Sequence, residues 1–406
     1  MTDGNSIDFK GIAEEFGTPT YVYDKSQIEE NYRKLHQAFR ESCPGARIHY
    51  SVKANSNLHI LKVFAELGAG ADCSSPMEIL LAERAGFVRP KILYTGNYES
   101  DADFAAIPED VQINFDDINS FRRLTKSRVP EVVSFRINPG IGRGGHEGIV
   151  TAGADAKFGV PYEKAILAYK IAQDAGAKRF GMHMMTGSNN LEPYYFAEIV
   201  DKLLTISGHI FPELEIKPEY FDIGGGFGVP YSDEESELEV ELTAKLVGEI
   251  FREKCDKYGY GSPALLIEPG RFLVANAGYL VTRVTGVKSS YKTFVGIDGG
   301  MNALLRPALY GAKHRFFVVG KDGEELSANL CGQICENSDI LLSGARMPKV
   351  EEGDLVVLRD AGAYGYAMSS NYNNRLRPAE VLVDHGAVRL IRRRETAEDI
   401  FRYYEE

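Results

Sequence analysis

The stretch Ile48-His49-Tyr50-Ser51-Val52-Lys53-Ala54-Asn55 is the part of the chain around which the other segments are organised. Apolar residues alternate with smaller or polar ones up to Val52, which is the pattern of a β-strand, and the alternation stops at Lys53. A lysine at the end of a buried strand is costly to desolvate, and such lysines often serve as amines that form Schiff bases with carbonyl groups. The alternative interpretation is a lysine whose amine extends to solvent, so this strand alone does not assign its role.

The composition narrows the class of protein. The 406 residues carry a net charge of -12 and are 44% hydrophobic, with no apolar run near the ~20 residues of a membrane helix. No cluster of Lys and Arg is long enough to follow a phosphate backbone, so neither nucleic acid nor a membrane is expected as a partner. The five cysteines are scattered, and the start of the chain lacks the pattern of a signal peptide. These features predict a cytoplasmic protein with free thiols and no metal site.

Eight short apolar segments, most of them separated by helical stretches, predict an α/β fold. Eight β/α units over roughly 220 residues fit a (β/α)8 TIM barrel, whose usual size is about 250 residues. A doubly wound sheet is the competing architecture, but it more commonly has about five or six strands. The eight segments are Ile48–Val52, Gly70–Cys73, Lys91–Thr95, Val111–Phe115, Glu131–Ile137, Arg179–Met185, Tyr220–Ile223 and Ala264–Ile267.

Beyond about Asn276 the pattern changes to short strands with few helices, which indicates a C-terminal antiparallel β-domain. The strand-like segment Pro19–Tyr23 is expected to add an edge to this domain, and an amphipathic helix is expected over Ile28–Phe39 with Ser26 as its cap. The predicted organisation is therefore an N-terminal strand joining the β-domain (residues 1–28), the barrel (29–277) and the β-domain itself (278–406).

Three groups of residues follow barrel strands one, seven and eight, at the end of the barrel where active sites lie. Lys53 follows the first strand, Gly224-Gly225-Gly226 the seventh and Glu268-Pro269-Gly270-Arg271 the eighth. A glycine triplet lets backbone N–H groups turn toward a bound anion. Pyridoxal phosphate needs all three groups, because it has a phosphate, an aldehyde for the lysine and a ring nitrogen that a carboxylate can keep protonated. Glu268 is the candidate for that carboxylate, and a salt bridge with Arg271 is the alternative.

These residues and further motifs resemble the alanine-racemase-fold (fold-type III) family of pyridoxal phosphate enzymes, and within it most closely the diaminopimelate decarboxylases. The resemblance covers nearly the whole chain and implies a lyase of lysine biosynthesis that converts meso-2,6-diaminopimelate to L-lysine and carbon dioxide. The matching motifs are Tyr50-Ser51-Val52-Lys53-Ala54-Asn55, Gly70-Ala71-Asp72, Lys157-Phe158-Gly159, Gly187-Ser188, Gly224-Gly225-Gly226, Glu268-Pro269-Gly270-Arg271, Arg306-Pro307-Ala308-Leu309-Tyr310, Cys335-Glu336 and Gly362-Ala363-Tyr364.

The resemblance implies a role for each matching residue. Lys53 bonds covalently to the cofactor, and Cys335 gives a proton to the substrate carbon after carbon dioxide leaves, because a thiol can both donate and recover a proton. The other cofactor-binding residues implied are Ser188, Gly224, Gly225, Gly226, Glu268, Pro269, Gly270, Arg271 and Tyr364. The substrate-binding residues implied are Arg271, Arg306, Tyr310, Glu336 and Tyr364. A homodimer with shared active sites is also implied, because in relatives the Cys-Glu loop enters the site of the neighbouring subunit.

Two departures from the family pattern concern the substrate. Met185 stands where the family has a histidine that stacks on the cofactor ring, and Gln333 and Asn337 stand where Pro and Ser are usual. His183 is expected to be a satisfied core histidine, with a cavity residue as the alternative.

Arg306 favours a substrate with a distal carboxylate, because a guanidinium binds a carboxylate in a two-pronged fork. The alternatives left open are decarboxylation of a D-amino acid, of lysine, ornithine or arginine, or of carboxynorspermidine. A racemase and a non-catalytic regulator remain as other classes of protein.

Overall fold

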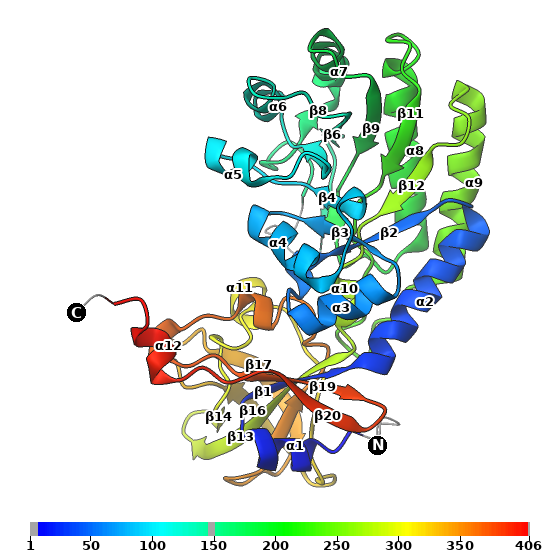
Figure 1. The fold of residues 1–406 in the computed structure, drawn as a ribbon. Coiled ribbons are helices and arrows are strands. Elements are labelled where there is room, and N and C mark those ends of the chain that lie inside the picture. The colour runs from blue at the N-terminus through cyan, green and yellow to red at the C-terminus, as the bar shows by residue number, and fades with distance from the viewer. Residues whose placement is uncertain (1–6, 145–150, 405–406) are drawn as a thin grey trace. The chain divides into compact units, whose positions relative to one another are not determined.

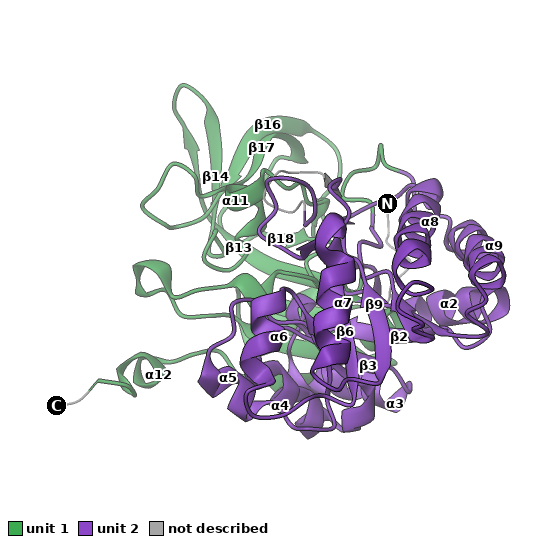
Figure 2. Ribbon diagram, turned by 90° about the horizontal axis from the view of Figure 1, so that it is seen from above, with its two compact units in different colours: residues 1–28, 230–235, 274–406 green, residues 29–229, 236–273 purple. Residues whose placement is uncertain are grey.

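The computed structural model describes residues 7–144 and 151–404, which fall into two compact units (Figure 2). The first, the barrel unit, comprises residues 29–229 and 236–273. The second, the β unit, comprises residues 1–28, 230–235 and 274–406. Within the described ranges, no helix is both long enough and apolar enough to cross a membrane.

Eight parallel strands close into a ring in the barrel unit (Figure 1). Each strand pairs with the next along the chain, and the last, β12, pairs with the first, β2. The predicted TIM barrel is therefore confirmed. The strands are β2 (Arg47–Ser51), β3 (Gly70–Cys73), β4 (Ile92–Tyr94), β5 (Gln112–Phe115), β6 (Val132–Asn138), β9 (Arg179–His183), β11 (Pro218–Asp222) and β12 (Ala264–Ile267).

A helix follows each barrel strand, and α2 (Lys25–Ser42) precedes the first. The long helices α8 and α9 bury one apolar face each and pack against one another. The helices that follow the strands are α3 (Leu58–Glu66), α4 (Pro76–Ala85), α5 (Asp101–Ala106), α6 (Ile118–Leu124), α7 (Ala165–Asp174), α8 (Pro193–Ile210), α9 (Val240–Tyr258) and α10 (Arg271–Val274).

Local residues specify where several of these helices begin. Ser75 accepts the Glu78 N–H ahead of α4, and Pro76 occupies the first helical position, where its missing N–H costs nothing. Helix α2 begins earlier than expected. Asp24 caps it instead of Ser26, because Asp24 Oδ1 accepts the N–H of Ser26 at 2.9 Å and of Gln27 at 3.3 Å. The interpretation of Ser26 as the cap was therefore wrong.

The β unit contains a mostly antiparallel sheet with the strand order β17-β16-β14-β13-β1-β19-β20, in which β18 pairs with β13 and β15. The predicted antiparallel module is confirmed. Its strands are β1 (Thr20–Asp24), β13 (Gly278–Ser289), β14 (Thr293–Ile297), β15 (Phe316–Val318), β16 (Glu325–Cys331), β17 (Ile340–Pro348), β18 (Leu355–Leu358), β19 (Ala379–Asp384) and β20 (Ala387–Arg392).

Strand β1 lies inside this sheet, so its expected place at an edge was wrong. It pairs antiparallel with β13 and parallel with β19. The side chains of Tyr21, Val22 and Tyr23 are all fully buried, as an interior strand with both faces covered requires.

The sequence pattern did not predict the hairpin of β16 and β17, whose turn carries Cys335 and Glu336. The remaining short elements are α1 (Phe9–Phe16), α11 (Arg306–Tyr310), α12 (Ala397–Phe401), the 3-10 helices η1 (Val52–Ala54), η2 (Arg89–Lys91), η4 (Tyr162–Lys164), η5 (Tyr366–Met368) and η6 (Tyr372–Asn374), and the strands β7 (Arg143–Gly144), β8 (Val160–Pro161) and β10 (Gly187–Ser188).

Candidate active site

Lys53 lies in η1, directly after the carboxyl end of β2, where it forms an ion pair with Asp72. The Nζ atom is 2.5 Å from Asp72 Oδ2, and the Ser51 hydroxyl lies 2.9 Å from the same oxygen. The Asp72 side chain, at the end of β3, is fully buried, whereas the Lys53 side chain is 43% exposed. Of the two interpretations left open by the strand, the structure has the amine reaching toward solvent, while the carboxylate beside it is buried. Burial raises the pKa of Asp72, the charge of Glu268 raises it further, and Lys53 opposes both effects.

The turn that carries Lys53 is fixed by Tyr50. The Tyr50 ring is fully buried and stacks on Phe64 of α3 with ring centroids 4.0 Å apart. Its hydroxyl donates to the carbonyl of Asn55 at 3.0 Å, on the far side of η1 from the strand. Because both ends of this short turn are held, Lys53 projects from a rigid support.

The turn Gly224-Gly225-Gly226 follows β11 and admits no larger residue at its first two positions. Gly224 and Gly226 have φ of +68° and +95°, which favour glycine. A Cβ at Gly224 would lie 2.8 Å from Met185 Sδ, and one at Gly225 would lie 2.5 Å from the carbonyl oxygen of Glu268. The N–H of Gly225 also lies 3.1 Å from Met185 Sδ. The thioether of Met185 therefore lies against the glycine turn.

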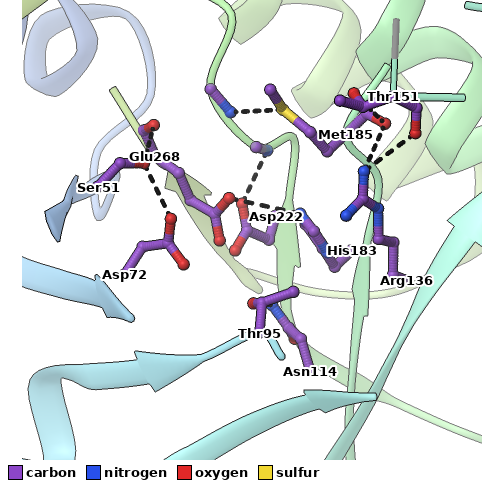
Figure 3. A network of polar contacts seen from close by, with 12 residues as sticks. Ser51, Asp72, Thr95, Asn114, Arg136, Thr151, His183, Met185, Asp222 and Glu268 are labelled. Carbon is purple, nitrogen blue, oxygen red and sulfur yellow. Dashed lines mark hydrogen bonds and ion pairs between the residues drawn. The ribbon is translucent and has the colours of Figure 1, made fainter. Parts of the chain in front are cut away.

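Glu268, at the end of β12, lies in a buried group with His183 and Asp222 (Figure 3). One ligand atom from each of the three lies within 4.8 Å of the others, and His183 Nε2 is 3.5 Å from Glu268 Oε2. Burial raises the pKa of Glu268, but His183 and Lys53 lower it more, to about 2. His183 is buried, as expected, and its Nε2 faces the carboxylate of Glu268. Neither ring nitrogen has a hydrogen-bond partner among the described residues, so the expectation that this histidine is satisfied was wrong.

Arg136 of β6 lies near the same part of the barrel and supports the segment that carries Met185 (Figure 3). Its guanidinium donates to the carbonyl of Thr151 at 3.0 Å and reaches the carbonyl of Met185 at 3.5 Å. It also lies 4.5 Å from the centroid of the Phe158 ring, in the predicted Lys157-Phe158-Gly159 motif.

Ser188 and Arg271 meet beside the glycine turn. Arg271 Nη2 donates to Ser188 Oγ at 3.0 Å, and the Asn190 N–H donates to the carbonyl of Gly226 at 2.8 Å. Glu268 forms an ion pair with His183, and Arg271 hydrogen-bonds to Ser188. Pro269 and Gly270 connect Glu268 to α10, and the Pro269 carbonyl accepts the Ser51 N–H at 3.3 Å.

These residues fit pyridoxal phosphate. Lys53 offers an amine, the glycine turn offers a cradle that a Cβ would fill, and Glu268 is a buried carboxylate. Glu268 Oε1 is buried and has no hydrogen-bond partner among the described residues, as expected of an atom that awaits a donor from a ligand. The barrel unit therefore contains an amine, an anion cradle and a carboxylate at one end of its strands.

The other predicted residues lie in the β unit. Arg306, the first residue of α11, is 6% exposed. Its Nη1 lies 3.0 Å from His314 Nε2, and its guanidinium lies 4.3 Å from the centroid of the Tyr231 ring. His314 Nδ1 lies 2.9 Å from the carbonyl oxygen of Arg359 and must donate to it, so Nε2 accepts from Arg306. Tyr310 ends the same short helix, half-buried.

Cys335 and Glu336 lie in the turn between β16 and β17, and both are exposed within the chain. Cys335 Sγ is 3.2 Å from Asn373 Oδ1, and Glu336 hydrogen-bonds to the hydroxyl of Tyr372. The buried carboxylate of Asp339 shapes the turn by accepting the N–H groups of Ile334 at 2.7 Å and Met301 at 2.6 Å.

Tyr364 has a φ of +56° and is half-buried. Its neighbour Gly362 lies so close to Val274 that an added Cβ would be 1.8 Å from the Val274 carbonyl oxygen. This close approach explains the glycine of the Gly362-Ala363-Tyr364 motif.

The sequence analysis assigned no role to three acids that shape these sites, namely Asp72, which it named only within a motif, Asp222 and Asp339. A usable signal existed for the first two, because each is the polar residue at or next to the carboxyl end of a barrel strand. Asp339 has no comparable signal, since its role depends on a hairpin that was not predicted.

Comparison with known proteins identifies relatives over nearly the full length. The family model described as "Pyridoxal-dependent decarboxylase, pyridoxal binding domain" matches residues 25–275. A diaminopimelate decarboxylase of Methanothermobacter thermautotrophicus is 41% identical over 396 residues, covering 96% of this chain and 92% of that protein. One from Thermoplasma acidophilum is 39% identical over 398 residues, covering 98% and 94%. The crystal structure of diaminopimelate decarboxylase from Helicobacter pylori complexed with L-lysine has a TM-score of 0.90 and 32% identity, covering 97% of this chain and 98% of that one.

Proposed function

This chain belongs to the pyridoxal-dependent decarboxylases, and we propose that it removes carbon dioxide from meso-2,6-diaminopimelate to give L-lysine. The observation that carries the proposal is the 41% and 39% identity to diaminopimelate decarboxylases over 96% and 98% of the chain. The family assignment also makes pyridoxal phosphate its cofactor, as the residues of the barrel unit predicted.

When bound, pyridoxal phosphate supplies an aldehyde that condenses with amines and a ring that withdraws electrons from the bond to be broken. Lys53 is the proposed point of covalent attachment, since its amine projects from a turn that Tyr50 and Asn55 hold. Glu268 is the proposed partner of the ring nitrogen. Its ionised form is favoured by His183 and Lys53, and an ionised carboxylate can accept a hydrogen bond from a protonated ring nitrogen.

The phosphate is proposed to bind at the glycine turn of residues 224–226, with Ser188, Arg271 and Tyr364 as further ligands. The hydrogen bond from Arg271 to Ser188 supports part of this set, because it places a guanidinium and a hydroxyl beside each other. Pro269 and Gly270 complete the connection from Glu268 to Arg271.

The substrate's distal carboxylate is proposed to bind Arg306 and Tyr310, and its amino group Glu336. The buried Arg306 guanidinium is oriented by His314 and Tyr231, which suits the two-pronged recognition of a carboxylate. A cation at the same end of a substrate would be repelled, which favours diaminopimelate over lysine or ornithine. Cys335 is proposed to donate a proton to the carbon that loses carbon dioxide, in line with its exposed thiol. Arg271 and Tyr364 are also proposed to contact the substrate.

We further propose that the enzyme is a cytoplasmic homodimer with shared active sites. The exposure of Cys335 and Glu336 on a hairpin turn supports this assembly, because a projecting turn can reach a second subunit. Equilibrium sedimentation tests the dimer, which a monomer at all concentrations would contradict.

The test of the proposed reaction is carbon dioxide release by the protein supplied with pyridoxal phosphate. The substrates to compare are meso-diaminopimelate, D-lysine, L-lysine, L-ornithine, L-arginine and carboxynorspermidine. Release from meso-diaminopimelate alone supports the proposal. Release from one of the other compounds and not from diaminopimelate contradicts the substrate assignment, and it would implicate Met185 and Asn337 in a changed specificity.

A further inference from the structure

Asp222 has no role in the chemistry described so far, although it is fully buried between the glycine turn and Glu268 (Figure 3). Resting on the proposed function, we infer that Asp222 carries a proton and donates a hydrogen bond to Glu268. It would thereby act as a positioning residue that keeps Glu268 ionised and oriented toward the cofactor's ring nitrogen.

Asp222 and Glu268 are both buried, and one carboxylate oxygen of each lies within 4.8 Å of the other. Two buried carboxyl groups that lie this close repel each other when both are ionised, so a proton on one of them is favoured. Two ionised carboxylates offer only acceptors, so a hydrogen bond between them exists only when one of the groups is protonated. The oxygens Asp222 Oδ2 and Glu268 Oε1 are both buried and lack another hydrogen-bond partner among the described residues. A proton on either group satisfies a buried atom that would otherwise carry a desolvation cost.

The surrounding charges place that proton on Asp222. The charges that act most on Asp222 are those of Glu268 and Asp72, and both are negative. Those that act most on Glu268 belong to His183, whose Nε2 is 3.5 Å away, and to Lys53. Burial raises the pKa of Asp222 well above its ordinary value, and the charge of Glu268 raises it further, in agreement with the geometry.

The backbone fixes Asp222 in this position. Asp222 is the last residue of β11 and lies beside His183 of β9 and Leu266 of β12 in the parallel register. Its Oδ1 accepts the Gly224 N–H at 2.8 Å, while the Gly224 carbonyl accepts the Glu268 N–H at 2.8 Å. One carboxyl group therefore links the proposed phosphate turn to the proposed partner of the ring nitrogen.

The test compares Asp222→Asn with Asp222→Leu in the full-length enzyme, with Asp174→Asn on the exposed end of α7 as a control. The Asn amide is neutral and can donate to Glu268, as the protonated Asp222 does, whereas the Leu side chain cannot. The protein is reconstituted with pyridoxal phosphate labelled with ¹⁵N at the ring. The ¹⁵N chemical shift reports ring protonation, and equilibrium dialysis gives the Kd of the cofactor.

We expect Asp222→Asn to keep the ¹⁵N shift of the protonated ring. In Asp222→Leu the shift should move toward that of the neutral ring. In Asp222→Leu we expect the Kd of the cofactor to rise and kcat to fall, each by about 10- to 100-fold, because a hydrogen bond to a charged group contributes a free energy of that size. The change in KM should be smaller.

The inference is overturned if Asp222→Asn loses the protonated signal, because an isosteric neutral group would then not replace Asp222. It is also overturned if Asp222→Leu folds, as circular dichroism shows, and keeps that signal. If the unmodified protein binds no pyridoxal phosphate at all, the proposed function itself fails, and dialysis shows this before any variant is made.

Discussion

Replacing Arg306 with alanine tests how the enzyme distinguishes its substrate. Arg306 is 6% exposed, and its guanidinium lies 4.3 Å from the centroid of the Tyr231 ring and 3.0 Å from His314 Nε2. The Nδ1–H of His314 donates to the Arg359 carbonyl, so His314 accepts from Arg306 at Nε2 and orients the guanidinium. The proposed ligand of this guanidinium is the distal carboxylate of diaminopimelate.

The expected loss of kcat/KM follows from the free energy that the contact between Arg306 and the substrate carboxylate contributes. Removing one partner of a buried, hydrogen-bonded charge pair costs about 2–5 kcal/mol, and about 1.4 kcal/mol corresponds to a factor of ten. We therefore expect kcat/KM for meso-diaminopimelate to fall by about 30-fold to several thousandfold in Arg306→Ala. Most of the change should be in KM, because the lost contact is present before and during the reaction.

The assay measures carbon dioxide release together with inhibition by L-lysine. L-lysine keeps the carboxylate that Arg306 is proposed to bind, so its inhibition constant should rise by a similar factor. D-lysine lacks this carboxylate, and any slow release from it should not change. Arg346→Ala is the matched control, because Arg346 is an exposed arginine of the same unit. An unchanged KM in Arg306→Ala would refute the reasoning and assign Arg306 a structural role.

Three further predictions test other parts of the account. Lys53→Ala should abolish turnover and the absorbance of the lysine-bound cofactor, whereas Lys62→Ala, at an exposed lysine, should keep both. Normal turnover in Lys53→Ala would show that Lys53 is not the lysine that carries the cofactor. Cys335→Ala should lower kcat by about 100- to 10,000-fold, the usual contribution of general acid catalysis, with the cofactor still bound; an unchanged kcat would remove Cys335 as the proton donor. Burial raises the pKa of Asp116 from 3.8 to about 6 against the opposing charge of Arg136. A carboxyl group with a raised folded pKa favours the folded state at low pH, and this contribution, about 3 kcal/mol, is lost as the pH rises from about 4 to 6. The free energy of unfolding, measured with urea across that pH range, should show this loss in the unmodified enzyme and not in Asp116→Asn. Equal pH profiles of the two proteins would contradict the raised pKa of Asp116.

Residues at the strand ends could be located from sequence because strand counting places them at one end of the barrel. Lys53, the glycine triplet and Glu268 each follow directly after an apolar segment, so the order of strands was sufficient to bring them to a common end. The contacts between these residues could not be predicted in the same way. The approach of His183 to Asp222 depends on the register of β9 against β11, and a shift of one residue would turn either side chain to the other face.

Two parts of the β unit show where a local pattern is insufficient. Strand β1 pairs with β19, and these strands lie more than three hundred residues apart in the sequence, so no local signal reveals that β1 is interior. Strands β16 and β17 were not predicted because much of both is exposed, which weakens the apolar alternation. The turn between them is shaped by Asp339, whose contact with Met301 also joins distant residues.

The most direct test of the central claim is to identify the residue that carries the cofactor. The enzyme is loaded with pyridoxal phosphate, the bond between cofactor and protein is reduced with borohydride, and the digested peptides are sequenced by mass spectrometry. The account predicts a pyridoxyl group on Lys53, in the turn that follows β2 beside Asp72. A pyridoxyl group on a different lysine, with Lys53 unmodified, would contradict the assignment of the active site.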